Sequence, residues 1–185
     1  EPTGQIVKAF MLGILTVPLS FTVSIPLMLV GAYTDFVVTI SDAIKISFYG
    51  AAIPEELAKL FVLWLVLRKN KYFDEKMDGI VYASCVALGF AALENIMYLF
   101  TNYDAWVSVG IIRALFAVPG HFFNGILMGY YYSLVRFDPL APARDRYLVL
   151  IAPIMAHGIY NTLLSVTDVS PVPALLIMIL FLFFC

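Results

Sequence analysis

The stretch that decides the fold is AIKISFYGAAIPEELAKLFVLWLVL, residues 43–67. This run is apolar enough to cross a bilayer, yet its middle carries Glu55, Glu56 and Lys59. Each charged side chain at the centre of a membrane helix costs roughly 2.5–3.5 kcal/mol on the insertion scale. We therefore expect these three side chains to face a protein interior or a water-filled cavity, where they pair or carry out chemistry.

The rest of the composition agrees with a membrane protein. The chain is 62% hydrophobic and 13% charged, and its mean hydropathy is +0.93. An ordinary soluble domain is about 45–50% apolar and about 25% charged. The chain has only 11 Lys and Arg residues, and most of them gather at predicted helix ends, so no basic groove for nucleic acid is expected. The sequence predicts an all-α fold: a polytopic transmembrane helical bundle forming a single domain over residues 1–185, and we expect it to be trimmed at its ends.

Six apolar runs are long enough, or nearly so, to cross about 30 Å of hydrocarbon. They cover residues 5–30, 43–67, 79–100, 106–135, 147–165 and 173–185. Prolines inside these runs predict kinks or breaks: Pro18 and Pro26 in the first, Pro54 at the Glu pair, and Pro119 with Gly120 in the fourth. Ser41 and Asp42 precede the second run as candidate N-caps.

The charges of the loops predict an orientation. Seven basic residues follow the second and fourth runs: Arg68, Lys69, Lys71, Lys76, Arg136, Arg144 and Arg146. The loops 31–42, 101–105 and 166–172 contain no Lys or Arg. By the positive-inside rule, loops 68–78 and 136–146 are predicted to be cytoplasmic in a multi-pass protein of a prokaryotic cell membrane.

Counting residues along each run gives the depth of its polar side chains. Glu55, Glu56, His121 and His157 all fall near the bilayer midplane, within about one helical turn of each other. Glu94 lies slightly nearer the outside. Both histidines of the chain are thus predicted inside the membrane with the carboxylates. This shared depth predicts an active site in a water-filled cavity, with the functional atoms roughly 4–7 Å apart, since zinc–ligand bonds are about 2.0–2.2 Å.

The acidic pair has two interpretations. Glu55 and Lys59 are spaced i,i+4 and can pair on one helix face, while Glu56 points about 100° away. A buried ion pair that fixes helix packing would explain Glu55 and Lys59. The second carboxylate favours a general base tuned by its surroundings.

The remaining polar positions also carry alternatives. His157 and Asn161 lie one turn apart on one face, and a lone membrane histidine is more often a helix–helix hydrogen bonder. Glu94, next to Asn95, is a candidate ligand, an orienter of a histidine, or a structural hydrogen bonder. Arg113 is expected to neutralise Glu94 or cap the cavity. Two more residues, Gly125 and Gly129, are expected to form a packing seam.

Four motifs together resemble the PrsW-type intramembrane proteases. They are Pro54-Glu55-Glu56-Leu57-Ala58-Lys59, Gly89-Phe90-Ala91-Ala92-Leu93-Glu94-Asn95, His121 with Gly129 eight residues on, and His157 with Asn161. The resemblance runs from the second to the fifth predicted span. It implies cleavage of a membrane-anchored protein substrate, such as an anti-sigma factor, at an outer, site-1 position. The wider superfamily includes CAAX prenyl-endopeptidases, whose EExxxR motif differs from the EExxK spacing here, and a non-catalytic scaffold.

Two mechanisms fit the same residues. In one, a Glu of the pair and His121 activate water directly, while Asn161 and His157 stabilise the oxyanion. In the other, Glu56, His121 and His157 hold Zn²⁺ and the remaining Glu is the base. The ligand types suit zinc, although the helical HExxH spacing is absent. Two other classes compete with a peptidase: a membrane scaffold, and a proton-coupled transporter, which the lack of an inverted repeat disfavours.

Overall fold

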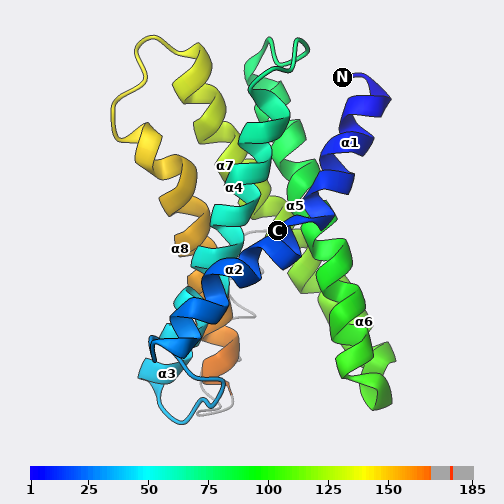
Figure 1. Cartoon of the computed structure of the whole chain (residues 1–185), viewed down its shortest axis with the longest axis vertical. Helices are drawn as coiled ribbons and strands as arrows, with labels where there is room; N and C mark the ends of the chain where they lie inside the picture. The colour runs from blue at the N-terminus through cyan, green and yellow to red at the C-terminus, as the bar shows by residue number, and fades with distance from the viewer. Residues whose placement is uncertain (168–175, 177–185) are drawn as a thin grey trace.

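The computed structural model describes residues 1–167 and Leu176, and these residues form helices and connecting loops without a strand. The helices are α1 (Thr3–Ile14), α2 (Thr16–Leu29), α3 (Ile40–Lys45), η1 (Ile46–Ala52), α4 (Ile53–Leu67), α5 (Lys76–Thr101), η2 (Tyr103–Ala105), α6 (Trp106–Ile112), η3 (Arg113–Ala117), α7 (Val118–Phe137) and α8 (Asp145–Val166). Figure 1 shows them as one bundle of long, tilted rods. The predicted all-α fold is confirmed.

Within the described residues, four helical stretches are long and apolar enough to cross a membrane: Thr3–Leu29, Lys76–Thr101, Tyr103–Phe137 and Asp145–Val166. The continuous helix formed by α3, η1 and α4 has similar length but carries the charged Glu55, Glu56 and Lys59. Five of the six predicted spans therefore correspond to helices of the bundle. The predicted span at 173–185 lies outside the described residues, apart from Leu176.

Prolines set where these long helices change character. A proline lacks the N–H that would bond the carbonyl four residues earlier, and its ring crowds that carbonyl. Pro18 stands four residues after Ile14, where α1 ends. Pro54 and Pro119 each follow a π-helical segment, η1 and η3, in which the turn is widened. Single-turn π segments are rare in proteins, and those that occur are often found at functional sites.

The start of the second span differs from the prediction. Thr39, not Ser41 or Asp42, is the N-cap of α3, and its hydroxyl accepts from the Asp42 amide. The Asp42 carboxylate in turn accepts from the Thr39 amide at 2.9 Å. This reciprocal capping box uses Asp42 as the third residue of the helix, so the helix begins earlier than the apolar run.

Helix α5 lies at the centre of the bundle and packs closely on α1 and α7. Glycines make this approach close. A Cβ on Gly129 of α7 would lie 2.3 Å from the Gly79 carbonyl oxygen of α5, and a Cβ on Gly125 would lie 2.9 Å from Ser84 Cα. On the other side, a Cβ on Gly13 would lie 2.2 Å from the Val86 carbonyl oxygen. The predicted packing seam at Gly125 and Gly129 is confirmed.

The two basic loops lie at one end of the molecule. Figure 1 places the N-terminus and the loops after α4 and α7 together at the top, and the α2–α3 loop and the start of α6 at the bottom. This common end agrees with the predicted alternation of spans. Which side of the membrane it faces stays a prediction.

Candidate active site

The first turns of α4 carry the acidic pair and its ammonium, directly after Pro54. Glu56 is 0% exposed and Lys59 is 2% exposed, so all their interactions are within the protein. Lys59 Nζ lies 2.9 Å from Glu56 Oε1 and 3.5 Å from Glu55 Oε2. The predicted Glu55–Lys59 pair is present, but Glu56 makes the shorter contact. The two carboxylates share one ammonium, although adjacent positions on a helix point in different directions.

His121 enters the site from α7, two residues after Pro119. Its Nδ1 lies 3.2 Å from Lys59 Nζ, and its Nε2 lies 2.9 Å from Glu94 Oε2 on α5. An ammonium can only donate, so Nδ1 is the acceptor and the ring proton is on Nε2. His121 therefore donates to Glu94 and turns its other nitrogen toward α4.

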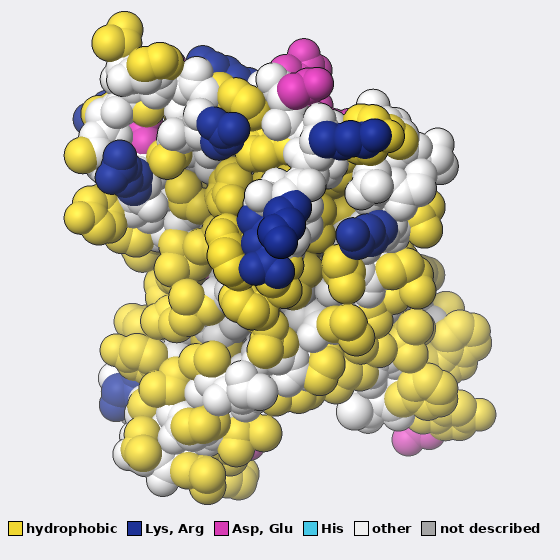
Figure 2. Space-filling view, turned by 45° about the horizontal axis from the view of Figure 1, so that its top comes forward, with side chains coloured by type: hydrophobic (Ala, Val, Ile, Leu, Met, Phe, Trp, Pro, Cys, Tyr) yellow, Lys and Arg dark blue, Asp and Glu magenta, His cyan; other side chains and the backbone are white. Residues whose placement is uncertain are grey.

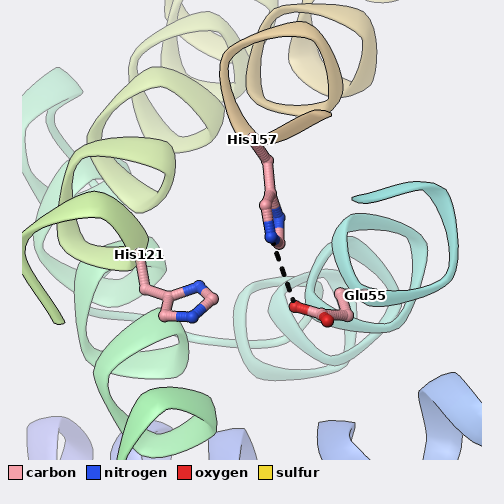
Figure 3. A group of neighbouring side chains, drawn as sticks. All are labelled: Glu55, His121 and His157. Carbon is pink, nitrogen blue, oxygen red and sulfur yellow. Dashed lines mark ion pairs between the residues drawn. The ribbon is translucent and has the colours of Figure 1, made fainter. Parts of the chain in front are cut away.

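His157 enters from α8 on the opposite side. Its Nδ1 lies 2.8 Å from Glu56 Oε1, and its Nε2 lies 3.8 Å from Glu55 Oε2 (Figure 3). A carboxylate only accepts, so Nδ1 donates to Glu56. The next residue, Gly158, lets α8 approach η1 closely, because a Cβ there would lie 2.4 Å from the Phe48 ring.

Three side chains from three helices converge at this point. Glu55, His121 and His157 each present one ligand atom, and the three atoms lie within 4.8 Å of one another. Figure 3 shows the three side chains directed into a common space between α4, α7 and α8. The predicted convergence is confirmed. The predicted ligand set contained Glu56, whereas the group of three contains Glu55 in its place, and Glu56 Oε1 accepts from Lys59 and His157. Which carboxylate would hold a metal stays a prediction.

An arginine supports the carboxylate behind His121. Arg113 Nη2 lies 2.5 Å from Glu94 Oε2, and its Nε donates to Asn95 Oδ1 at 2.7 Å. The guanidinium also lies 3.8 Å from the centre of the Tyr98 ring. The predicted pairing of Arg113 with Glu94 is thus present. The contact of Glu94 with His121 fits one of its three predicted roles, that of orienting a histidine.

Asn161 was predicted at the site, but in the described part of the chain its side chain is not hydrogen-bonded to the group. Asn161 lies one turn beyond His157 on α8, and no hydrogen bond joins its side chain to this group within the described residues. Its predicted role at an oxyanion therefore stays a prediction.

Phe90 was not predicted as a site residue, yet its ring lies 4.0 Å from Lys59 Nζ and 5.1 Å from the His121 ring. Phe90 lies one turn before Glu94 on α5, and this spacing could have indicated that its ring faces the same site.

The donor set suits a metal ion. Each histidine donates one ring N–H to a carboxylate, an arrangement that fixes the tautomer of metal-binding histidines in other proteins. The other nitrogen of His157 lies 3.8 Å from Glu55 Oε2, and the other nitrogen of His121 accepts from Lys59, which a metal ion would have to displace. Two imidazoles and a carboxylate form a common set of protein ligands for zinc. Glu56 Oε2 is buried and has no hydrogen-bond partner among the described residues. The site therefore also contains an unused acceptor for a water molecule.

Comparisons with known proteins agree with this geometry. The family model described as "PrsW family intramembrane metalloprotease" matches residues 1–185. The chain is 34% identical over 169 residues to Protease PrsW of Clostridioides difficile strain 630, covering 90% of this chain and 69% of the relative. Identity to Protease PrsW of Oceanobacillus iheyensis is 35% over 165 residues, or 89% and 72% of the two chains, and to that of Bacillus subtilis strain 168 it is 33% over 167 residues, or 89% and 72%.

No solved structure matches the chain. The family match over the full length, the relatives and the buried Glu/His/His group all identify the same kind of protein. The chain belongs to the PrsW family of intramembrane metalloproteases, and it is a peptidase and a multi-pass bacterial membrane protein.

Proposed function

We propose that this peptidase cleaves a membrane-anchored regulatory protein, such as an anti-sigma factor, at an outer, site-1 position, with Zn²⁺ held by Glu55, His121 and His157. The observation that carries the proposal is the group of three ligand atoms within 4.8 Å, each histidine backed by its own carboxylate. A zinc ion bound there would act as a Lewis acid on the scissile carbonyl and on the attacking water.

We assign the general base to Glu56. Its Oε1 is fixed by Lys59 and by His157, so the carboxylate cannot rotate freely. Its Oε2 has no hydrogen-bond partner in the described part of the chain, so it can accept a proton from water as the water oxygen attacks the carbonyl carbon. The same proton can then pass to the amine that leaves when the C–N bond breaks.

The surrounding groups hold these parts in place. Arg113 neutralises Glu94, and Glu94 holds the His121 ring with its Nδ1 toward Lys59 on α4. Lys59 compensates the charge of the acidic pair in a site that water does not reach freely. We assign Asn161 to the oxyanion, because its amide N–H₂ can donate and it lies one turn from His157.

The buried site implies that the substrate span enters by displacing a helix. Helix α6 and the segment η3 are the best candidates, because none of their residues is buried. They are attached to α5 through Arg113, which contacts Glu94, Asn95 and Tyr98. A substrate helix that takes the place of α6 would therefore reach the site beside His121.

The test is cleavage of a single-span, membrane-tethered protein reconstituted in liposomes with the purified peptidase. Glu56→Gln keeps the shape of the side chain but removes the base, so the rate should fall by about 10²–10⁴-fold. The matched control, Asp74→Asn, changes an exposed loop carboxylate and should leave the rate unchanged.

A chelator should abolish cleavage by the wild type, and Zn²⁺ should restore it. Cleavage that is indifferent to the chelator would assign the chemistry to Glu and His alone. Full activity of folded Glu56→Gln would refute the assignment of the base. A wild type that cuts no tethered substrate, with both variants still folded, would refute the proposed substrate class.

A further inference from the structure

A second polar feature lies at the end of the bundle that carries the basic loops. A hollow of about 410 Å³ opens where the loop after α4 lies beside the C-terminal end of α7. Four cationic side chains line it, and no acidic residue does: Arg68, Lys69, Lys71 and Arg136. On the face that Figure 2 draws, Lys and Arg side chains gather over the upper half, and the lower half is largely hydrophobic.

These four cations have no carboxylate partner within the described residues, unlike Lys76 and Arg144 of the same loops. Lys76 pairs with Asp138 at 3.3 Å, and Arg144 lies 3.8 Å from Asp145. Arg68 instead rests on the Trp64 ring at 4.7 Å, and Arg136 on Phe137 at 5.4 Å. A guanidinium stacked on an aromatic face keeps its N–H donors available at the edge of the plane.

Aromatic side chains fix the shape of the hollow. The Phe73 ring packs 6.0 Å from the Tyr132 ring and 4.8 Å from the Phe137 ring, centre to centre. This contact holds the loop against the end of α7, so Arg136 and the basic loop residues meet although they are far apart in the sequence. The positive-inside rule explains why basic residues occur in these loops. It does not explain why unpaired cations from two segments surround one hollow.

We propose that this hollow binds the phosphate group of an anionic phospholipid. The hollow lies at the end of the apolar helices, at the level where headgroups lie, and basic pockets between membrane helices suit such headgroups. The acyl chains would then run along the exposed face of α4, where Phe61 is 50% and Trp64 is 44% exposed. Bound phosphate would join the C-terminal ends of α4 and α7, the helices whose N-terminal turns carry Lys59 and His121.

Trp64 provides a direct test, because it lies beside the hollow and the chain has only one other tryptophan, Trp106. In a Trp106→Phe background, Trp64 fluorescence is measured in nanodiscs made of equal parts of phosphatidylcholine and phosphatidylglycerol. One sample has brominated acyl chains on the phosphatidylcholine only, and the other has them on the phosphatidylglycerol only. Preferential binding predicts stronger quenching by brominated phosphatidylglycerol. Arg68→Gln with Arg136→Gln should weaken this preference about fivefold for each charge removed.

The matched control is Arg144→Gln with Arg146→Gln, which removes two charges from the same end of the molecule but not from the hollow. This pair should keep the preference. Equal quenching by the two brominated lipids, or equal loss in both double variants, would overturn the proposal. Titration with inorganic phosphate in nanodiscs of phosphatidylcholine is the second arm. Phosphate binding that depends on Arg68 and Arg136, without any lipid preference, would assign the hollow to a soluble phosphate and refute the lipid.

Discussion

At the scale of single residues, Lys59 governs the charges buried in the site. Its ammonium contacts Glu55, Glu56 and His121 Nδ1, and it lies over the ring of Phe90. Removing one partner of a buried ion pair leaves an uncompensated charge, which is more costly than the pair itself is stabilising. Lys59 therefore holds the carboxylates in the absence of a bound metal.

We expect Lys59→Met to lower the free energy of unfolding of the metal-free protein by about 3–5 kcal/mol. Lys76→Met is the matched control, because Lys76 pairs with Asp138 at the surface, where such a pair contributes about 1 kcal/mol or less. Thermal unfolding in detergent measures both, with and without Zn²⁺. Zn²⁺ should restore part of the stability of Lys59→Met alone. Equal losses in the two variants would show that the buried charges do not depend on Lys59.

The sequence predicted the residues of the site better than their pairing. Glu55, Glu56 and Lys59 can be identified from the sequence alone, because they are charged residues in an apolar run. Burying an unpaired charge in a membrane is so costly that such residues are expected to pair or to carry out chemistry. The sharing of one ammonium by both carboxylates depends on side-chain rotamers and on His157 from a distant helix, which no local pattern records. The ring of Phe90 under Lys59 was missed for the same reason.

At the scale of helices, the two segments that carry Glu55 and His121 share one local design. A π-helical segment, a proline and then the functional side chains occur in η1–α4 before Glu55 and in η3–α7 before His121. The missing N–H of the proline favours the widened turn before it. Pro54 and Pro119 predicted breaks at these places, but the sequence did not show that each break is a π segment in a continuous helix.

Gly129 offers a test of the contact between α5 and α7. A Cβ there would lie 2.3 Å from the Gly79 carbonyl oxygen, so Gly129→Ala must push the two backbones apart. Overpacking of this kind costs about 1–3 kcal/mol. Gly120→Ala on the same helix is the control, since a Cβ there meets nothing within 4 Å. Thermal unfolding should show a lower Tm for Gly129→Ala only. An unchanged Tm for Gly129→Ala would mean that α5 and α7 do not pack as described.

At the scale of the whole molecule, a bundle of apolar helices surrounds a small charged centre. Composition and run lengths were sufficient for the all-α class and for the five described spans, because hydrocarbon thickness fixes helix length. Counting depth was sufficient to bring Glu55, His121 and His157 together. Whether Glu55 or Glu56 joins the two histidines depends on the rotation of α4, α7 and α8 about their helix axes, and the sequence does not determine that rotation.

The most direct test of the central claim is the visible absorption spectrum of the protein titrated with Co²⁺, which reports ligand geometry where Zn²⁺ is silent. The account predicts ligand-field bands of a nitrogen and oxygen site in the wild type. Glu55→Gln, His121→Ala and His157→Ala should each lose these bands, and Glu56→Gln should keep them. Bands that survive in Glu55→Gln and vanish in Glu56→Gln, or that never form in the wild type, would contradict a metal centre built from Glu55, His121 and His157.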